Sequence, residues 1–419
     1  MLFIFIIMAS IGLHEYGHYY YARKFGAKVT QFMLGFGPTL FSTRRGEVEY
    51  GVKMVPFGGF VRILGMYPPP AAGEGDGERY TGFKRLAFEA KQQSQEETVD
   101  CAERAFTRLP VTKRIIVMAA GPIMNLFLAT IFFTILIVMV GQPTVSTTIE
   151  TPVVCVPTVT SVGDTPACVP TVAKQVGLQS GDTLMGVGSI PILVWEDLAP
   201  ALEKNAGNTV IRFIRDGESK TVPIVLAPVD YPVTRPDGTF TGETVNRFFL
   251  GVTPSVVNET KPVTSVPNYM WNLTTQSFNA LIRMPERIIE LADAMITNKE
   301  RNVESPISVV GASRLGGEIA ATDNPVNTKL AGFLMLAGSL NLFLFMFNLL
   351  PLLPLDGGHI AAAMFEGVRR RVAILRHRPD PGPADITKLL PLTYMVAGMF
   401  ILVGLVTILA DIVKPLTLG

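Results

Sequence analysis

The pentapeptide His-Glu-Tyr-Gly-His at 14–18 carries side chains suited to metal-dependent hydrolysis. Residues four apart share one face of a helix, so His14 and His18 can direct ring nitrogens at the same zinc ion. Glu15 is placed to act as a general base that activates water without binding the metal. The motif alone is weak, because this spacing also arises by chance in soluble helices. The chemistry it predicts is cleavage of a peptide bond.

The sequence around the motif strengthens this interpretation. The motif lies in an apolar stretch, 2–22, that is long enough to cross a bilayer core roughly 30 Å thick. An ionisable side chain at the centre of such a span costs about 2.5–3.5 kcal/mol or more, so three within five residues need compensation. Metal ligation supplies it. The alternative, a polar cluster that joins helices by hydrogen bonds, explains the three groups less well.

A catalytic zinc usually has three protein ligands and one open position, so a third ligand is expected. Asp356, in the run NLLPLLPLDGGH, is the preferred candidate, and His359 is the alternative. Pro351 and Pro354 must end the preceding helix because proline lacks an amide hydrogen, which predicts unwound backbone at Asp356. Asn348 is predicted either to hold the main chain of a substrate or to hydrogen-bond another helix.

Four apolar segments are expected to position these residues as transmembrane helices: 1–23, 114–140, 329–359 and 389–413. The composition agrees, with 17% charged residues against about 25% in a typical soluble chain. The first segment has neither the leading positive charge nor the small-residue cleavage site of a signal peptide, so it is expected to remain in the mature chain. The fold class predicted is a polytopic α-helical membrane protein.

The basic residues predict the orientation of these spans. Arg23, Lys24 and Lys28 follow the first span and no basic residue precedes it, which places the N-terminus outside. The loops 24–113 and 360–388 are then cytoplasmic. The second of these loops is rich in arginine, as cytoplasmic loops are. The first and third spans both run inward, so His14 and Asp356 are expected to meet in the cytoplasmic half of the bilayer.

The first cytoplasmic loop contains a predicted membrane-associated β-hairpin region at 29–66. Within it one face of a strand at 48–55 carries the larger side chains, namely Val48, Tyr50, Val52 and Met54. The following segment, 67–105, has little apolar content and several prolines and glycines near its start. It is predicted to be a mobile loop.

The extracytoplasmic region is expected to hold a small α+β domain at 141–265 and a helical connector at 266–328. Asp216-Gly217 is typical of a hairpin turn. The run from Val172 to Lys204 resembles the PDZ pattern of a GLxxGD turn, a strand and an amphipathic helix, and its groove would accept an extended peptide. A β-domain without a ligand is the alternative. The connector is predicted either to lie along the outer membrane interface or to be soluble.

Charge and cysteine content exclude some classes of protein. The formal net charge is +1, which gives no indication of nucleic-acid binding. Three cysteines are too few for a disulfide scaffold. Cys155 and Cys168 fall in the same extracytoplasmic region, where oxidation is favoured, and a bridge between them is predicted.

The chain resembles the site-2 protease family of intramembrane zinc metalloproteases. The resemblance is carried by HEYGH, by AGPIMN at 120–125 and by NLLPLLPLDGG at 348–358. The runs GFGPTLFSTRRGEVEYGVKMVPFGGF and SPISVVGAS are most similar to the actinobacterial branch. A PDZ-like insertion fits the bacterial members that cleave anti-sigma factors. One departure is that Pro354 lies one residue later than in well-known Gram-negative members.

The resemblance implies roles for individual residues. His14, His18 and Asp356 would bind one zinc ion, and Glu15 would be the catalytic base. Two further groups are implied: a substrate-binding loop with Asn348 and Pro351, and a supporting pair, Gly121 and Asn125, in the second span. The strand at 48–55 would pair with the substrate.

The implied reaction cuts a single-pass transmembrane protein that has already been shortened on its outer side, and the PDZ-like domain would act as a size filter or a peptide dock. The expected location is the plasma membrane, with the N-terminus and the PDZ-like domain extracytoplasmic. Two other functions remain open: a catalytically silent protein that binds membrane helices, and a metal transporter. The intact HEYGH and Asp356 argue against the first, and retention of function by Glu15→Gln would favour the second.

Overall fold

The computed structural model describes residues 2–70, 80–158, 167–234, 240–297, 301–302, 304–322 and 324–416. The chain forms two compact units. One comprises Met1–Val140 together with Lys261–Gly419, and the other is Gly141–Thr260. They are named here the helical unit and the β unit, and each is described by itself.

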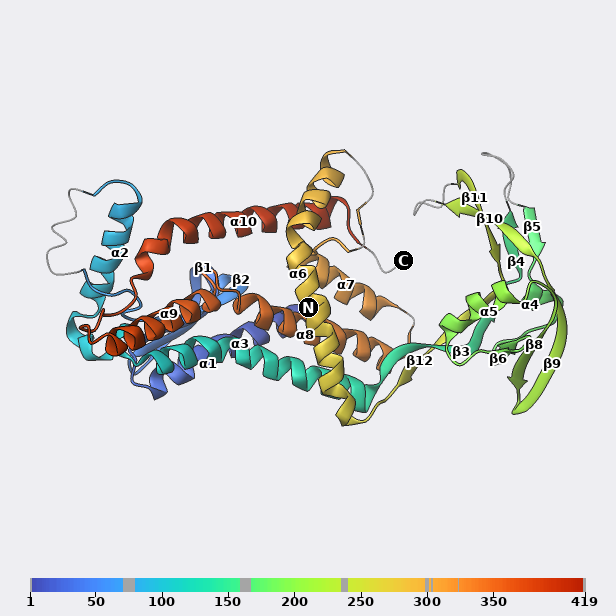
Figure 1. Cartoon of the computed structure of the whole chain (residues 1–419), viewed down its shortest axis with the longest axis horizontal. Helices are drawn as coiled ribbons and strands as arrows, with labels where there is room; N and C mark the ends of the chain where they lie inside the picture. Colours follow the sequence, from blue (N-terminus) through green and yellow to red (C-terminus); the bar gives the residue numbers. More distant parts are fainter. Residues whose placement is uncertain are drawn as a thin grey trace. The chain divides into compact units, whose positions relative to one another are not determined.

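The helical unit is organised around one central helix. Its long apolar helices are α1 (Leu2–Lys24), α3 (Val111–Thr134), α8 (Val326–Asn348) and α10 (Leu390–Val413). A further helix, α9 (Asp356–Leu375), follows α8. A π-helical stretch, η3 (Ile135–Val140), continues α3. The central helix is α3, which packs against α1, α8 and α9 (Figure 1). A buried hydrogen bond from Asn341 to Ser10, 3.0 Å long, also joins α8 to α1.

Among the described residues, three helices are long and apolar enough to cross a membrane: Val111–Val140, Val326–Asn348 and Ile386–Val413. They overlap the second, third and fourth predicted spans, but the third helix ends at Asn348, whereas the span was predicted to reach residue 359. The first predicted span, α1, is a 23-residue helix, but it is not one of the three. The ionisable residues of HEYGH lower its hydropathy. The arrangement with four spans stays a prediction.

The structure differs from the loop expected at 360–388, because α9 continues as a helix to Leu375. The alanines and arginines of α9 are strong helix formers. The charged residues toward its C-terminal end make it too polar to be predicted as an apolar span. Glu366 is fully buried in this helix and is bound by Arg114 of α3 and by Arg370 one turn further along α9. The arginine-rich segment is therefore anchored to the central helix.

The segment 67–105, predicted as a mobile loop, also contains a helix. Helix α2 (Phe83–Glu97) and the 3₁₀ stretch η1 (Val99–Arg104) occupy its second half, and residues 71–79 lie outside the described chain. The low apolar content was misleading, since Lys, Arg, Glu and Gln favour helix as strongly as most apolar residues do. Buried Lys91 of α2 forms an ion pair with Asp385, at 2.8 Å.

Two helices occupy the predicted connector at 266–328. They are α6 (Val266–Ile296) and α7 (Val309–Ala321). In Figure 1, α6 crosses the direction of α3 and α10. It exposes a row of large apolar side chains, namely Trp271, Phe278, Ile282, Ile289 and Ile296. That stripe is consistent with the interfacial alternative, which remains a prediction.

The predicted β-hairpin region forms a sheet from two long strands, β1 (Val29–Arg45) and β2 (Val48–Ile63). Residues 31–34 of β1 each pair with two residues of β2, one in 49–52 and one in 59–62. The two long strands therefore act as four segments, and their order across the sheet is 39–45, 48–53, 31–36 and 59–63. Val48, Tyr50 and Phe32 pack with α1 in one apolar cluster.

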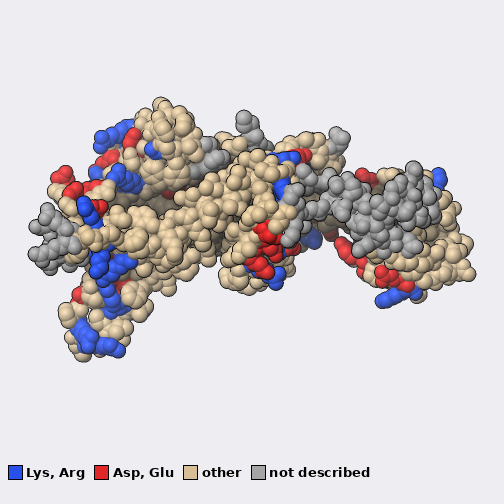
Figure 2. Space-filling model, turned by 90° about the horizontal axis from the view of Figure 1, so that it is seen from above, with Lys and Arg blue, Asp and Glu red and all other residues tan. Residues whose placement is uncertain are grey.

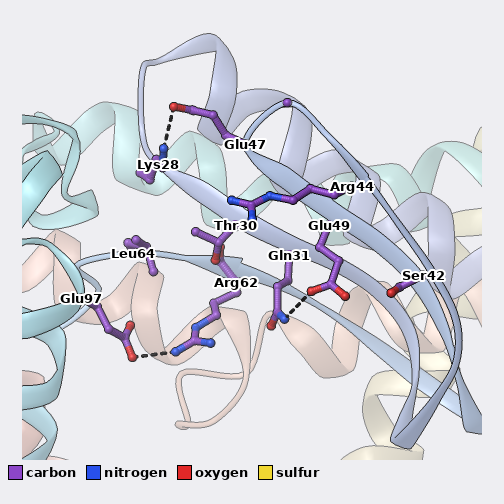
Figure 3. Close-up of a pocket in the computed structure, with 11 residues that line it drawn as sticks. Lys28, Thr30, Gln31, Ser42, Arg44, Glu47, Glu49, Arg62, Leu64 and Glu97 are labelled. Carbon is purple, nitrogen blue, oxygen red and sulfur yellow. Dashed lines mark hydrogen bonds and ion pairs between the residues drawn. The ribbon is translucent and has the colours of Figure 1, made fainter.

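The opposite face of this sheet is polar and lines a cavity of about 700 Å³ (Figure 3). Its charges neutralise one another. Gln31 donates a hydrogen bond to Glu49, and Arg62 pairs with Glu97 of α2. Hydrogen bonds from Arg104 and Lys28 lower the pKa of Glu47 to about 2. This cavity therefore lies on the face of the sheet that points away from α1, and the chemistry predicted for HEYGH is elsewhere.

The β unit contains one main sheet with the strand order β12-β3-β6-β8-β9, and β7 pairs with β6. Its elements are β3 (Gln142–Pro152), β4 (Cys155–Thr158), β5 (Ala167–Pro170), α4 (Val172–Gln175), β6 (Thr183–Val187), β7 (Ile190–Pro191), α5 (Leu198–Lys204), β8 (Gly207–Arg215), β9 (Glu218–Leu226), β10 (Pro228–Thr234), β11 (Phe240–Phe248) and β12 (Val252–Glu259). Leu184, Ile211 and Phe213 of the sheet pack with Ala201 and Leu202 of α5. The predicted hairpin turn is confirmed, since Asp216 and Gly217 both have positive φ between paired Arg215 and Glu218.

The GLQSGD run at 177–182 forms a tight turn before β6. The carboxylate of Asp182 accepts a hydrogen bond from the Gln179 amide and two from Arg215. Burial alone would raise the pKa of Asp182, but these hydrogen bonds outweigh it and hold the pKa below its usual range. The element order that led to the PDZ comparison is therefore present, and the peptide groove stays a prediction.

Cys155 is disulfide-bonded, whereas Cys101 is a free thiol. Cys155 lies in β4, which pairs with β5, the strand that contains Cys168. The side chain of Cys168 lies outside the described part of the chain. The Cys155–Cys168 bridge thus stays a prediction.

Candidate active site

The structure brings together the three predicted metal ligands. His14 and His18 lie on one face of α1, and their Nε2 atoms are 3.2 Å apart. Asp356 comes from the start of α9, and its Oδ2 lies 3.3 Å from each of these nitrogens. The two histidines are buried. The three ligand atoms lie within 4.8 Å of one another, which is a spacing that one metal ion can bridge.

The ring of His18 is oriented by the backbone of α3. Its Nδ1 lies 2.8 Å from the carbonyl oxygen of Val117 and must donate to it, because a carbonyl can only accept. The proton is thereby fixed on Nδ1. The lone pair of Nε2 then points at Asp356 and His14, as ligation requires.

The ring of His14 is held by Asn125, also from α3. The side-chain amide of Asn125 lies 3.1 Å from His14 Nδ1. If its nitrogen donated to Nδ1, the proton of His14 would be on Nε2 and would block ligation. Asn125 Oδ1 has no other partner among the described residues, so turning the amide over breaks no other hydrogen bond. We infer that Oδ1 accepts from Nδ1 when metal is bound.

Replacement of Asn125 by Leu, a side chain of similar size that cannot accept a hydrogen bond, is expected to weaken zinc binding by about 10–100-fold. Competition with a chelator of known affinity measures the change. Asn341→Leu, which removes a buried asparagine of α8 that bonds Ser10, is the matched control. Equal zinc affinity of Asn125→Leu and the wild-type chain would show that Asn125 does not orient His14.

Gly121 lets α3 approach the metal site. A Cβ at this position would overlap Nε2 of His18 and lie 2.8 Å from Cε1 of His14. Across the same helix contact, a Cβ on Gly17 of α1 would press on the Ala120 carbonyl. Hence the AGPIMN run combines a glycine for close approach with an asparagine that reaches His14.

Glu15 lies outside the group of three ligand atoms, next to the edge of the sheet. A Cβ on Gly59 would be 3.1 Å from its Cγ, so a larger residue there would crowd Glu15. The backbone of Val61 also lies near the Glu15 carboxyl group. Glu15 is thus positioned by segment 59–63, whereas the histidines beside it are positioned by α3.

The loop between α8 and α9 differs in one respect from the prediction. Asn348 is the last residue of α8, as expected from the prolines that follow, but Asp356 is the first residue of α9 and does not lie on unwound backbone. The positive end of the helix dipole favours a carboxylate in the first turn, so Asp356 is well suited to be the first residue of this helix. Pro351 is exposed and lines a cavity of about 630 Å³. His359, the alternative ligand, is not part of the three-residue group.

The residues present fit a zinc ion. Two neutral imidazole nitrogens and one carboxylate oxygen are a ligand set typical of catalytic zinc. Oδ2 of Asp356 is buried and, in the described chain, has no hydrogen-bond donor. A buried carboxylate oxygen needs a cation or a hydrogen-bond donor as its partner. A cation bound between this oxygen and the two imidazole rings would be that partner.

The predicted substrate strand needs correction. Segment 48–53 has 39–45 on one side and 31–34 on the other, so both of its edges are paired. The side chains of Val48 and Tyr50 are used in packing against α1. Alternation of residues correctly predicted a strand, but it carries no information about which strand lies at an edge.

Two contacts at the site escaped prediction because they involve the backbone. They are the hydrogen bond of His18 to the Val117 carbonyl and the close approach of Gly59 to Glu15. Every residue type offers a carbonyl, so no residue pattern marks the first contact. The two adjacent glycines at 58–59 were the available signal, since they indicate close approach of another segment.

Comparison with known proteins gives a consistent result. The model of the family described as peptidase family M50 matches residues 2–378. The zinc metalloprotease Rip1 of Mycobacterium bovis and that of Mycobacterium tuberculosis are each 34% identical, over 100% of this chain and 98% of theirs. The zinc metalloprotease RasP of Oceanobacillus iheyensis is 24% identical, over 88% of this chain and 90% of its own.

Proposed function

Because the chain belongs to peptidase family M50, the site-2 proteases, and is a zinc metalloprotease, we propose that it cleaves a peptide bond within the transmembrane segment of a single-pass membrane protein. The substrate class that fits best is an anti-sigma-factor-like protein already shortened on its outer side. The observation that carries the proposal is the convergence of His14, His18 and Asp356 beside Glu15, next to helices apolar enough to span a membrane.

His14, His18 and Asp356 hold the zinc ion in this proposal. When bound, zinc acts as a Lewis acid that activates water and polarises the peptide carbonyl. Glu15 takes the proton from the attacking water and passes it to the leaving amine. Gly59, in segment 59–63, packs against the Glu15 side chain and restricts where its carboxyl group can point.

The substrate must be partly extended before it is cut, because the hydrogen bonds of a membrane helix shield its peptide bonds. Segment 59–63 supports this step. It is an edge of the sheet in the described chain, and it lies against Glu15. We infer that the extended substrate pairs with this edge, by strand addition, and that Asn348 and Pro351 contact it from the other side.

Crosslinking distinguishes the two edges of the sheet. Arg62→Cys is expected to form a disulfide with a substrate that carries a cysteine near its cleavage position, whereas Thr43→Cys, on the opposite edge, is not. Both side chains are exposed, so reactivity alone does not favour either. The experiment uses the Glu15→Gln, Cys101→Ser background to retain the substrate. Preferential crosslinking of Thr43→Cys would refute substrate pairing at 59–63.

The β unit supports the proposed selection of shortened substrates. It provides a PDZ-like order of elements, with α5 packed on the main sheet, so a new chain end of the substrate can dock there or a bulky outer domain can be excluded. In the proposed topology this unit and the N-terminus are extracytoplasmic. The oxidised state of Cys155 fits that side of the membrane.

Co-reconstitution tests the function. Purified chain and a single-pass protein without its outer domain are placed in liposomes, and the products are mapped by mass spectrometry. The expected result is one zinc-dependent cut inside the apolar segment. Binding without cleavage would indicate a silent helix-binding protein instead, and zinc uptake into the liposomes would indicate a transporter.

A further inference from the structure

A second cavity in the helical unit lies between α2 and the residues that lead into α10. Its volume is about 470 Å³. One wall is aromatic, with Tyr80, Phe83 and Phe88, and Phe83 is largely exposed. This cavity is formed by other residues than the metal site, so the proteolytic reaction does not account for it.

The remaining walls of this cavity are cationic. Three lysines line it, and of the described residues around it Asp385 is the one acidic residue. Asp385 is bound to Lys91 at 2.8 Å, and the pairing outweighs burial to hold the pKa of its carboxyl group below the usual range. Lys84 and Lys388 are exposed and have no recorded ion pair with any described residue. Two positive charges therefore face the cavity without compensation.

The cavity also lies where a membrane helix begins. The apolar segment that can span a membrane runs from Ile386 to Val413, so Lys388 marks its boundary. Arg369 of α9 lines a neighbouring cavity together with Asp385 and Lys388, and Figure 2 shows Lys and Arg gathered at one end of the helical unit. Basic cavities beside membrane helices are suited to the head groups of anionic lipids.

We propose that this cavity binds the head group of an anionic glycerophospholipid from the leaflet in which α10 begins. Lys84 and Lys388 contact the phosphate and the anionic head group, while Phe83 and Phe88 contact the glycerol and the upper acyl chains. The bound lipid joins α2 to the residues that lead into α10, beside the Lys91–Asp385 ion pair that already links them. Inorganic phosphate has the same charged group but lacks the acyl chains.

Native mass spectrometry and thermal unfolding test this site on the full chain in a neutral detergent. Phosphatidylglycerol is expected to raise the melting temperature more than phosphatidylcholine does, and millimolar inorganic phosphate is expected to have no effect. Lys84→Gln/Lys388→Gln should weaken phosphatidylglycerol binding roughly 25-fold, at about fivefold for each lysine. Lys174→Gln/Lys204→Gln, which removes the same charge from the surface of the β unit, is the matched control.

Two results would overturn the proposal. One is equal retention of phosphatidylglycerol by the Lys84/Lys388 variant and the control. The other is equal stabilisation by phosphatidylcholine or by inorganic phosphate, which would assign the cavity to a ligand without an anionic lipid head group. Stabilisation by anionic lipid that falls as salt is raised and is lost in the variant supports the site.

Discussion

We expect Glu15→Gln to abolish cleavage of a co-reconstituted single-pass substrate and to leave one zinc ion bound per chain. Glutamine has nearly the same size, so the packing of this side chain against Gly59 is retained. It cannot take a proton from water. General-base catalysis typically contributes about 10²–10⁴-fold, and no other described carboxylate besides that of Asp356 is grouped with the histidines.

The cleavage rate in liposomes and the zinc content by mass spectrometry must be measured on the same preparation. Glu196→Gln, an exposed position in the β unit, is the matched control and should retain full activity. Cleavage by Glu15→Gln at more than a few per cent of the wild-type rate would refute its role as the base. Loss of zinc from the same variant would instead make Glu15 a ligand.

Asp356→Asn is the second substitution for which we expect a large effect, in this case loss of the metal. The substitution removes the negative charge that lies 3.3 Å from both Nε2 atoms and leaves two neutral histidines as ligands. Loss of a residue that only hydrogen-bonds a metal ligand typically weakens metal binding by about 10–100-fold, and the loss of zinc affinity in Asp356→Asn should be larger. After dialysis against a chelator, zinc should fall from about one per chain to near zero, and cleavage should fall with it.

Two further variants make the Asp356 result specific. Asp100→Asn, at an exposed position in η1, should keep both zinc and activity. His359→Ala tests the alternative ligand and should keep most of the zinc, because His359 is not in the three-residue group. If His359→Ala lost zinc and Asp356→Asn kept it, the ligand set would have to be reassigned.

The site could be predicted largely from the sequence because its reactive groups are side chains with little choice of partner. Two histidines one helical turn apart must share a face. Three ionisable groups in an apolar segment need a partner, and Asp356 follows another apolar segment that ends in prolines. These local constraints sufficed to bring residues from the two ends of the chain together.

The parts that escaped prediction depend on neighbours that a local pattern does not specify. Alternation at 48–55 predicted a strand, yet whether that strand has free edges depends on segments 31–36 and 39–45. Helices α2 and α9 were missed because their charged residues suggested loops. In α9 those charges are satisfied by tertiary pairs, such as Arg114 with Glu366.

The dependence of the metal site on α3 has a consequence for biosynthesis. A ribosome delivers His14 and His18 first, then the α3 groups that orient them, and Asp356 only after most of the chain has been made. The nascent chain therefore contains an incomplete ligand set throughout insertion of its first helices. In the proposed mechanism, proteolytic competence is acquired only when α8 and α9 reach α3, so the unfinished protein would not cut membrane proteins that are inserted beside it.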